Sequence, residues 1–417
     1  MTISSKWHGV DLTDDQLTLL DWLREFCENE IRPNAARYDK SQATPWEIIH
    51  KAAAAGIYSL EFFGQLFFGD PTGKTAALAI EELFFADPGI ALALFGTGLP
   101  AAAIMANGTD EQKMKWLPLC FADSKGKPAL AAFCSSESGA GSDVSGMRTR
   151  AVYNARKKTW TVNGTKDWIT NGAIANEDGE ITGVHVVVAV VDPKLGARGQ
   201  ASFIVPPGTK GLSQGTKHHK LGFRASHTAE VVFDNVEVPA DCLLGGKEAL
   251  DARLAKVRAG QKSGGQAAMA TFEGTRWMVA AMGVGLARAA FEYAVQYATE
   301  REAFGKPIAE HQQVAQMIAE LDVNIDAARL LVMDAASKYL TTGKLSRAEG
   351  SKAKLFATEL AVKATRYAVQ ILGGAGYVED HPVERWFRDA PLLTIFEGTS
   401  QIQNLMIAST ATGLRIR

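Results

Sequence analysis

The sequence predicts an α+β protein that is mainly helical, with a helical domain, a small β-domain and a helical bundle in that order. Apolar residues recur at helical spacing in residues 1–128. Short runs rich in Val and Thr, separated by Gly, Asn and Pro, fill residues 129–245. Long apolar stripes return in residues 246–417. These patterns set the expected domain boundaries, and 417 residues are enough for two or three domains.

The first domain is expected to begin with a helix capped by Asp14. Its apolar positions lie three residues apart: Leu17, Leu20, Leu23 and Phe26. A second helix fits residues 74–87, and Asp110 opens a third, which ends near Pro118. The Phe- and Gly-rich segment 62–73 has no clear periodicity, so the sequence leaves its conformation open.

The second domain is expected to be a compact β-structure, a small barrel or sandwich. Its strand-like runs are ALAAFCSS (129–136), TWTVNG (159–164), VHVVVAVV (184–191) and TAEVVFDNVEVP (228–239). The dipeptide Asn163-Gly164 stands between strand-like flanks, which predicts a hairpin turn at that point.

The third domain is expected to contain long antiparallel helices. One stripe keeps helical spacing throughout: Val314, Met317, Ile318, Leu321, Ile325, Ala328 and Leu331. Similar patterns cover residues 273–301 and 346–372, and long helices of this kind pack as a bundle. The segment 250–266 is charged and then Gly-rich, which favours a mobile connector.

Composition excludes several kinds of function. The net charge of −2 provides no general basic field for a nucleic-acid backbone. The cysteines form no C-x-x-C pair, so neither a disulfide framework nor a metal site is expected, and a reducing cytoplasm fits best. The N-terminus lacks the apolar core of a signal peptide. The apolar stretch 76–105 is broken by acidic residues and Pro88, so we expect a buried helix pair rather than a membrane span.

Two segments of the β-domain are candidates for ligand binding. In FCSSESGAGSDVSG (133–146), glycines allow the backbone to approach a ligand closely, although such loops are more often plain turns. The loop fits neither a P-loop nor a dinucleotide-binding G-x-G-x-x-G. In DWITNG (167–172), Trp168 either lies against a flat ring, with the Thr170 hydroxyl at its edge, or fills the core.

The segment IFEGTSQIQ (395–403) contains the main candidate for chemistry. Ser400 and Gln403 have the spacing of a capping box, which places Glu397 just ahead of a helix, followed by the flexible Gly398. Glu397 is then either a partner of the helix dipole or a general base beside apolar residues. Burial would raise its pKa and the dipole would lower it, and the sequence does not decide between them.

Two further segments carry possible phosphate contacts. Arg301 and Phe304 combine a guanidinium fork with an aromatic surface, as a dinucleotide site requires, although an arginine that ends a helix is common. The glycines of QILGGAGY (370–377) either end a helix or allow backbone to approach a phosphate.

Taken together, six segments resemble the acyl-CoA dehydrogenase family in order and spacing, over nearly the whole chain. They are AFCSSESGAGSDVSG, DWITNG, FEGTR, EREAFGKPIAEHQ, QILGGAGY and IFEGTSQIQ. The resemblance implies that family's three domains, with a C-terminal four-helix bundle, an FAD cofactor and an acyl-CoA substrate.

The resemblance also implies roles for individual residues. FAD contacts are expected from Phe133, Ser135, Ser136, Gly141, Ser142, Trp168, Ile169, Thr170, Arg301, Phe304, Gln312, Gln370, Gly373, Gly374, Thr399 and Gln401. Substrate contacts are expected from Ser142, Arg276 and Gly398. Arg301, Phe304 and Gln312 match contacts that a neighbouring subunit makes, which implies a homotetramer built as a dimer of dimers with shared FAD sites.

In the chemistry that the resemblance implies, Glu397 removes the α-proton of the thioester. The backbone N–H of Glu397 and a flavin ribityl hydroxyl bind the carbonyl, and a hydride passes to flavin N5 to give a trans-2-enoyl-CoA. Some relatives place the base where this chain has Thr275. The expected electron acceptor is an electron-transferring flavoprotein. An acyl-CoA oxidase using O₂ and a non-catalytic subunit of a mixed oligomer are the alternatives.

Three features depart from the family pattern. The first loop has Glu137-Ser138-Gly139 where an acidic residue, Pro and Gly are usual. EFFGQLFFG stands in place of a Tyr-Gly-Gly element, so the wall of the acyl pocket is not assigned. Ser409 occupies a position where several relatives carry a CoA-contacting arginine, and Arg415 or the basic connector is the alternative source of that contact.

Overall fold

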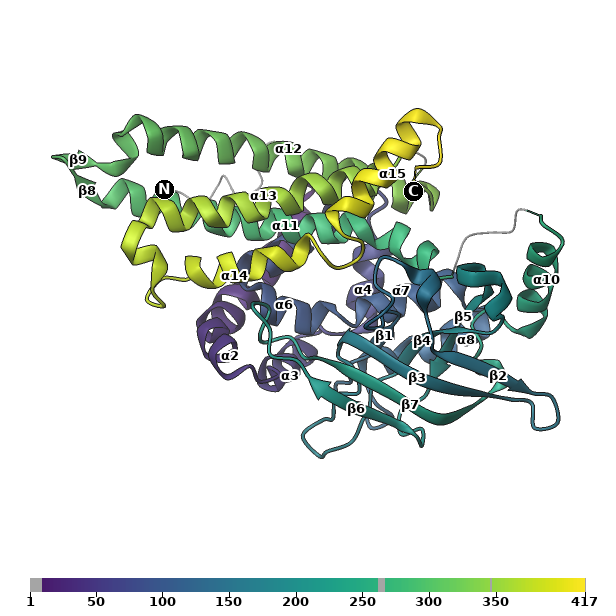
Figure 1. The fold of residues 1–417 in the computed structure, drawn as a ribbon. Coiled ribbons are helices and arrows are strands. Elements are labelled where there is room, and N and C mark those ends of the chain that lie inside the picture. Colours follow the sequence, from purple (N-terminus) through teal and green to yellow (C-terminus); the bar gives the residue numbers. More distant parts are fainter. Residues whose placement is uncertain (1–9, 262–266, 346, 417) are drawn as a thin grey trace.

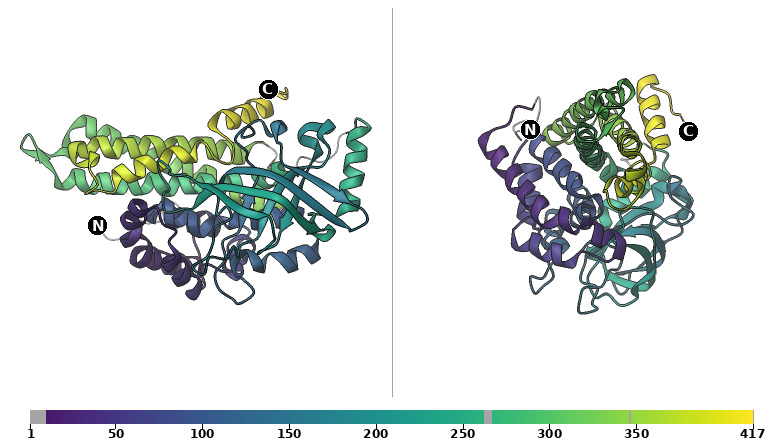
Figure 2. Two further views of the ribbon diagram at one scale, coloured as in Figure 1. Left: turned by 60° about the horizontal axis from the view of Figure 1, so that its bottom comes forward. Right: turned by 90° about the vertical axis from the view of Figure 1, so that its left-hand side faces the viewer.

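The structure is a computed structural model, which describes residues 10–261, 267–345 and 347–416. The N-terminal helices and the β-domain pack side by side, and a bundle of long helices extends away from both (Figure 1; Figure 2). This order of helical, β and helical parts confirms the fold class that the sequence predicts.

The first domain consists of short helices around an apolar core. They are α1 (Asp14–Phe26), a π turn (Cys27–Ile31), a 3₁₀ turn (Arg32–Asn34), α2 (Ala35–Ser41), α3 (Trp46–Ala54), α4 (Leu60–Phe68), α5 (Lys74–Ala86), α6 (Pro88–Phe95), α7 (Gly98–Asn107), α8 (Asp110–Trp116) and α9 (Pro118–Phe121). The cap of α1 is Thr13, which forms a capping box with Gln16, so the prediction of Asp14 was wrong by one residue. Most of the segment that the sequence left open forms α4.

Two segments, Pro88–Asn107 and Gly274–Glu300, are long and apolar enough to cross a membrane by length and composition. In the fold, 67% and 78% of their most apolar stretches are buried, so packing in the core accounts for their apolar character. Charged groups are also buried here. Glu81 of α5 accepts paired hydrogen bonds from Arg329 (3.0 and 2.8 Å) and another from Arg288 (2.6 Å).

The β-domain is one seven-stranded sheet with the order β1-β4-β2-β3-β7-β6, and β5 pairs with β4. Its strands are β1 (Ala132–Cys134), β2 (Arg150–Asn154), β3 (Thr159–Thr170), β4 (His185–Val190), β5 (Gln200–Val205), β6 (Leu212–Lys217) and β7 (Thr228–Pro239). The predicted hairpin turn at Asn163-Gly164 was wrong, because β3 runs straight through it and pairs with β7 on both sides. The β2–β3 turn lies earlier, at residues 155–158. Asn163-Gly164 marks a register shift instead.

The C-terminal domain is a bundle of long helices, as predicted. It comprises α11 (Ala267–Glu300), β8 (Glu302–Ala303), β9 (Lys306–Pro307), α12 (Gln312–Thr342), α13 (Glu349–Leu372), α14 (Val383–Leu393) and α15 (Ser400–Thr412). Helix α10 (Lys247–Arg258) precedes the bundle and lies beside the β-domain (Figure 1), where Arg253 donates hydrogen bonds to the carbonyls of Arg198 and Gln200, at 2.9 and 2.5 Å. The prediction of a mobile connector was wrong for its first part, which forms α10 and buries Leu250, Leu254 and Val257. Residues 262–266 of that segment lie outside the described residues.

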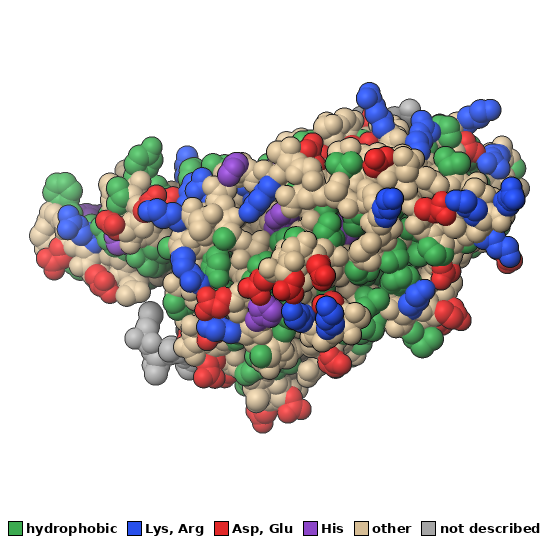
Figure 3. All heavy atoms as spheres, turned by 90° about the horizontal axis from the view of Figure 1, so that it is seen from below, with side chains coloured by type: hydrophobic (Ala, Val, Ile, Leu, Met, Phe, Trp, Pro, Cys, Tyr) green, Lys and Arg blue, Asp and Glu red, His purple; other side chains and the backbone are tan. Residues whose placement is uncertain are grey.

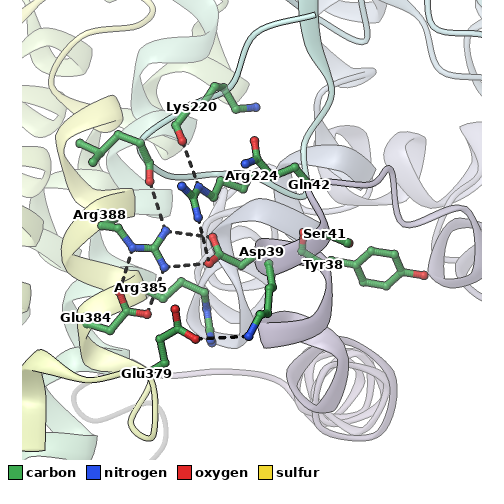
Figure 4. Close-up of polar contacts among 12 residues, drawn as sticks. Tyr38, Asp39, Ser41, Gln42, Lys220, Arg224, Glu379, Glu384, Arg385 and Arg388 are labelled. Carbon is green, nitrogen blue, oxygen red and sulfur yellow. Dashed lines mark hydrogen bonds and ion pairs between the residues drawn. The ribbon is translucent and has the colours of Figure 1, made fainter.

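A polar network joins the three domains beside α14 (Figure 4). Arg388 of α14 contacts Asp39 of α2 through both terminal nitrogens, at 3.0 and 2.7 Å. Arg224, in the loop between β6 and β7, lies 3.9 Å from the same carboxylate. Buried Asp389 accepts the backbone N–H of Phe223 from that loop at 2.5 Å. The network therefore fixes α14 against both other domains.

The face shown in Figure 3 carries acidic and basic side chains side by side, without a continuous basic area. This mixture of signs agrees with the near-zero net charge.

Candidate active site

Glu397 lies in the turn between α14 and α15, in a backbone conformation that few residues adopt. Its φ is +52°, and the following Gly398 has φ +96°. A non-glycine residue in this left-handed region costs about 1–3 kcal/mol and persists only where surrounding contacts enforce it. The turn is closed by a hydrogen bond from the Ser400 N–H to the Thr394 carbonyl at 3.0 Å.

The α15 helix begins differently from the prediction. Its N-cap is Thr399, whose hydroxyl accepts the Ile402 N–H, so the predicted capping box at Ser400 was wrong. The Ser400 hydroxyl instead donates to Glu359 of α13 at 2.5 Å. Gln403 reaches back to the turn, and its Nε2 donates to the Gly398 carbonyl at 2.8 Å.

The carboxylate of Glu397 meets helix α11. The Thr275 hydroxyl donates to Glu397 Oε2 at 2.6 Å. Burial raises the pKa of Glu397, and Thr275, Lys354 and Arg276 partly oppose that rise. The pKa direction that the sequence left open is therefore upward, and a carboxylate with a raised pKa is a stronger base once it is ionised.

The backbone N–H of Glu397 is also a potential hydrogen-bond donor to a ligand. Among the hydrogen bonds of the described residues, none is donated by its N–H. An N–H in this position fits the expected contact with a substrate carbonyl, because a partly enclosed donor without an internal partner gains most from a ligand oxygen.

The Gly-rich loop of the β-domain is anchored by a buried ion pair. Lys166 of β3 is fully buried, and its Nζ lies 2.9 Å from Glu137 Oε1 and 2.9 Å from the Ser135 carbonyl oxygen. Beyond this anchor the loop is open, since a Cβ added at Gly139 or Gly141 would meet nothing within 4 Å. The loop therefore has a rigid base and an accessible rim, which suits a bound cofactor.

Trp168 is exposed rather than packed in the core. Its φ is +58° and 53% of its surface is accessible. Asp167 accepts its N–H at 2.8 Å and lies 2.7 Å from a ring nitrogen of His218, which fixes the turn of the strand. The core-filling interpretation of Trp168 was therefore wrong. Ile169 is 3% exposed, so only its backbone is placed to contact a ligand, while Thr170 is half-buried.

The base of the Gly-rich loop and Glu397 both contact the N-terminal part of α11. Phe133 of β1 packs edge-on against Phe272 at 5.8 Å, and Phe272 lies one helical turn before Thr275, the hydrogen-bond partner of Glu397. One group of predicted residues belongs to the elements that approach this part of α11. They are Phe133 of β1 and the loop residues after it (Ser135, Ser136, Gly141, Ser142), the end of β3 (Trp168, Ile169, Thr170), Arg276 of α11, and the residues before and at the start of α15 (Gly398, Thr399, Gln401).

The second group lies at the opposite end of the bundle, around the β8–β9 hairpin (Figure 1). It comprises Arg301, Phe304, Gln312, Gln370, Gly373 and Gly374. Arg301 and Gly374 line one cleft of about 400 Å³ with Tyr297, Ile308, Ile371, Leu372 and Ala375. Phe304, at the hairpin tip, is 96% exposed. About 25 helical residues separate the two groups along α11, a distance of roughly 40 Å. This distance is longer than a single FAD molecule.

Sequence reasoning missed two buried lysines that support this site, Lys166 and Lys354. Lys354 donates hydrogen bonds to the carbonyls of Leu393 and Gly398, at 3.0 and 2.8 Å. A signal was present, because Lys354 stands on the small, apolar face of α13 with Ala357 and Ala361, where a charge needs a partner.

The departures from the family pattern also have structural settings. EFFGQLFFG belongs to α4, with Phe63 packed on Phe95 at 5.3 Å and on Phe121 at 4.7 Å. The Ser409 hydroxyl accepts the Ile416 N–H at 3.2 Å. The Glu137 of the altered first loop is the anchor of that loop, as the buried ion pair shows.

The fold thus has three parts, a small β-domain between helical domains, and Glu397 contacts the first long helix of the C-terminal part. Models of the N-terminal, middle and C-terminal domains of acyl-CoA dehydrogenases match residues 13–123, 132–236 and 262–412. The chain therefore belongs to the acyl-CoA dehydrogenase family, and it is an enzyme of that class.

Known acyl-CoA dehydrogenases are similar to this chain over nearly its full length. The short-chain-specific acyl-CoA dehydrogenase of Clostridium acetobutylicum is 36% identical, with 95% of this chain and 98% of that protein covered. The structure of butyryl-CoA dehydrogenase from Megasphaera elsdenii is 34% identical, covers 97% of this chain and 100% of its own, and has a TM-score of 0.82. A chain in a structure of the electron-transferring flavoprotein of Acidaminococcus fermentans is 33% identical, covers 97% of this chain and 99% of its own, and has a TM-score of 0.83.

Proposed function

We propose that this enzyme converts an acyl-CoA thioester to the trans-2-enoyl-CoA, with FAD as cofactor and Glu397 as the base. The observation that carries the proposal is the setting of Glu397. Its carboxylate accepts a hydrogen bond from Thr275, its pKa is raised by burial, and its own N–H is available to a substrate carbonyl.

In this proposal the chain's residues divide the work. The Glu397 N–H binds the thioester oxygen and so acidifies the α-carbon, and the Glu397 carboxylate takes the α-proton. Ser142, Arg276 and Gly398 contact the substrate. FAD, when bound, supplies the hydride acceptor. The open rim of the Gly-rich loop and the exposed ring of Trp168 fit its flat ring system.

We also propose that the FAD site is shared between subunits of a homotetramer, a dimer of dimers. The support is the separation of the two groups of predicted residues, which lie at opposite ends of the bundle. A second copy of the chain would bring its Arg301, Phe304 and Gln312 to the β-domain of the first. A cytoplasmic location is supported by the cysteines, all free and buried.

The proposed electron acceptor is an electron-transferring flavoprotein. An acyl-CoA oxidase is the second candidate, and the same purified protein separates them: in air, a dehydrogenase reduced by substrate stays bleached far longer than an oxidase. A non-catalytic subunit is disfavoured, since Glu397, Trp168 and the anchored loop are all in place.

The test is an anaerobic titration with acyl-CoAs of different shapes, including butyryl-CoA, glutaryl-CoA and cyclohexane-1-carbonyl-CoA, while flavin absorbance is followed. Glu397→Gln should keep FAD and acyl-CoA binding but lose about 10²–10⁴-fold in turnover, the usual contribution of a general base. Glu379→Gln is the matched control, because Glu379 is exposed and its ion pair, with Lys40 at 3.7 Å, lies on the surface. Turnover by Glu397→Gln at the control's rate would move the base elsewhere.

A further inference from the structure

Lys354 is a charged residue enclosed within the helical bundle. Its exposed surface is 0%, and it stands in the second turn of α13. Removing an ammonium group from water is costly unless hydrogen bonds and nearby charge compensate. The hydrogen bonds that compensate it are accepted by the turn that carries Glu397.

The ammonium group of Lys354 connects the two ends of that turn. One N–H donates to the carbonyl of Leu393, the last residue of α14, at 3.0 Å. Another donates to the carbonyl of Gly398, directly after Glu397, at 2.8 Å. The Gly398 carbonyl accepts a second bond from Gln403, also at 2.8 Å.

This arrangement explains how Glu397 stays in its unfavourable left-handed conformation. A strained residue relaxes unless its neighbours are held on both sides. Here one buried cation holds the residues on both sides, and the Thr275 hydroxyl holds the carboxylate at 2.6 Å. The carboxylate and the backbone N–H of Glu397 are thereby fixed relative to α11 and α13.

We propose that Lys354 is the positioning residue of the catalytic base: its ammonium group closes the 393–398 turn, aims Glu397 and keeps its carboxylate ionised. The inference rests on the proposed role of Glu397 as the base. It adds a residue that does not touch substrate and acts through the turn and through its charge.

The charges that face Lys354 support this electrostatic role. Burial lowers the pKa of Lys354 to about 8, Glu397 opposes that fall, Arg276 adds to it and Glu359 opposes it. Lys354 is therefore mainly protonated at neutral pH. Its charge in turn acts to lower the pKa of Glu397, against the larger effect of burial. Without the ammonium, Glu397 would hold its proton to higher pH.

The experiment compares Lys354→Met, Lys354→Gln and Lys352→Met in the FAD-loaded enzyme. Lys352 lies on the same helix but is exposed, which makes it a matched control. The readouts are flavin content, kcat, KM and the pH profile of kcat. Lys354→Met should lower kcat by about 100-fold, the usual effect of misplacing a catalytic group by roughly 1 Å, with a smaller change in KM.

The two Lys354 variants separate position from charge. Gln retains a donor for one carbonyl, so kcat should fall less than with Met, whereas the charge is lost in both. In both variants the acid limb of the profile should move to higher pH, because the neighbouring cation no longer favours the Glu397 carboxylate. Lys352→Met should match the wild type in every readout.

Two results would overturn the inference while leaving the base assignment intact. The first is a flavin-containing Lys354→Met enzyme with normal kcat. The second is a fall in kcat in both variants while the acid limb of the pH profile stays where it is in the wild type. Lys354 would then have a structural role only. If Glu397→Gln itself keeps full turnover, the proposed function fails instead, so the two failures are distinguishable.

Discussion

The buried ion pair beneath the Gly-rich loop offers a prediction whose magnitude follows from the structure. The Lys166 side chain is 0% exposed and that of Glu137 is 8% exposed, with 2.9 Å between their charged atoms. Glu137 also accepts the N–H groups of Arg148 and Thr149, at 2.7 and 3.0 Å. Burial opposes the ionisation of Glu137, but Lys166 and these bonds hold its pKa below the ordinary value.

Lys166→Met would leave a buried carboxylate without its cation. Breaking a buried pair in this way costs about 3–5 kcal/mol. The two N–H hydrogen bonds to Glu137 remain and compensate in part. We therefore expect the free energy of unfolding to fall by about 3 kcal/mol, the lower end of that range. The control is Lys157→Met, whose pair with Glu237 (3.1 Å) has both side chains roughly half exposed, and such pairs contribute about 1 kcal/mol or less.

The assay is urea unfolding of the FAD-loaded proteins, with midpoints compared at matched slopes, together with the Kd for FAD. Lys166→Met should lower the midpoint much more than Lys157→Met and weaken FAD binding, because the loop loses its anchor. Free energies of unfolding that agree for the two variants to within about 0.5 kcal/mol would refute the assignment of Lys166 and Glu137 as the anchor.

Two further predictions concern packing between elements. Burial, with a contribution from Asp87, raises the pKa of Asp389 to about 8, so the native state keeps a proton that the unfolded chain releases near pH 4. As the pH rises from about 4 to about 8, the free energy of unfolding should therefore fall by up to about 1.4 kcal/mol per pH unit. In unfolding measurements across this pH range, Asp389→Asn should abolish this pH dependence. The exposed Asp380→Asn is the control and should retain it. An unchanged pH dependence in Asp389→Asn would contradict the raised pKa of Asp389. Gly183→Ala would place a Cβ 1.9 Å from the Leu130 carbonyl oxygen, so its thermal midpoint should drop by the equivalent of about 1–3 kcal/mol or more, and an unaltered midpoint would argue against this packing.

Helix and strand predictions succeeded where periodicity was long and unbroken. The stripe from Val314 to Leu331 lies within α12, and the run 228–239 matches β7. The failures came from short local signals. Asn163-Gly164 permits a turn, but the flanking residues gain more by continuing to pair with β7. The charged half of the predicted connector folds as α10 because three apolar residues on one face find a surface to cover.

For the candidate site as well, some features could be inferred from the sequence and others could not. Glu397, the Gly-rich loop and Trp168 could be proposed as site residues from the sequence because their motifs lie within short segments whose order along the chain is characteristic. The apolar face of α13 marks Lys354 as a charge that needs a partner, but the partners of the two supporting lysines could not be predicted, because they are carbonyl and carboxylate groups on other elements. A backbone carbonyl carries no residue-specific signal in the sequence.

The sequence by itself determined the three-part order of the fold, the family and the residue that is proposed as the base. Periodicity and motif spacing are local properties, so they can be read along the chain. The tertiary structure alone decided that Glu397 meets Thr275, 122 residues away, that burial raises the pKa of Glu397, and that Lys354 closes its turn. Burial and charge proximity depend on which segments pack together, and no single segment contains that information.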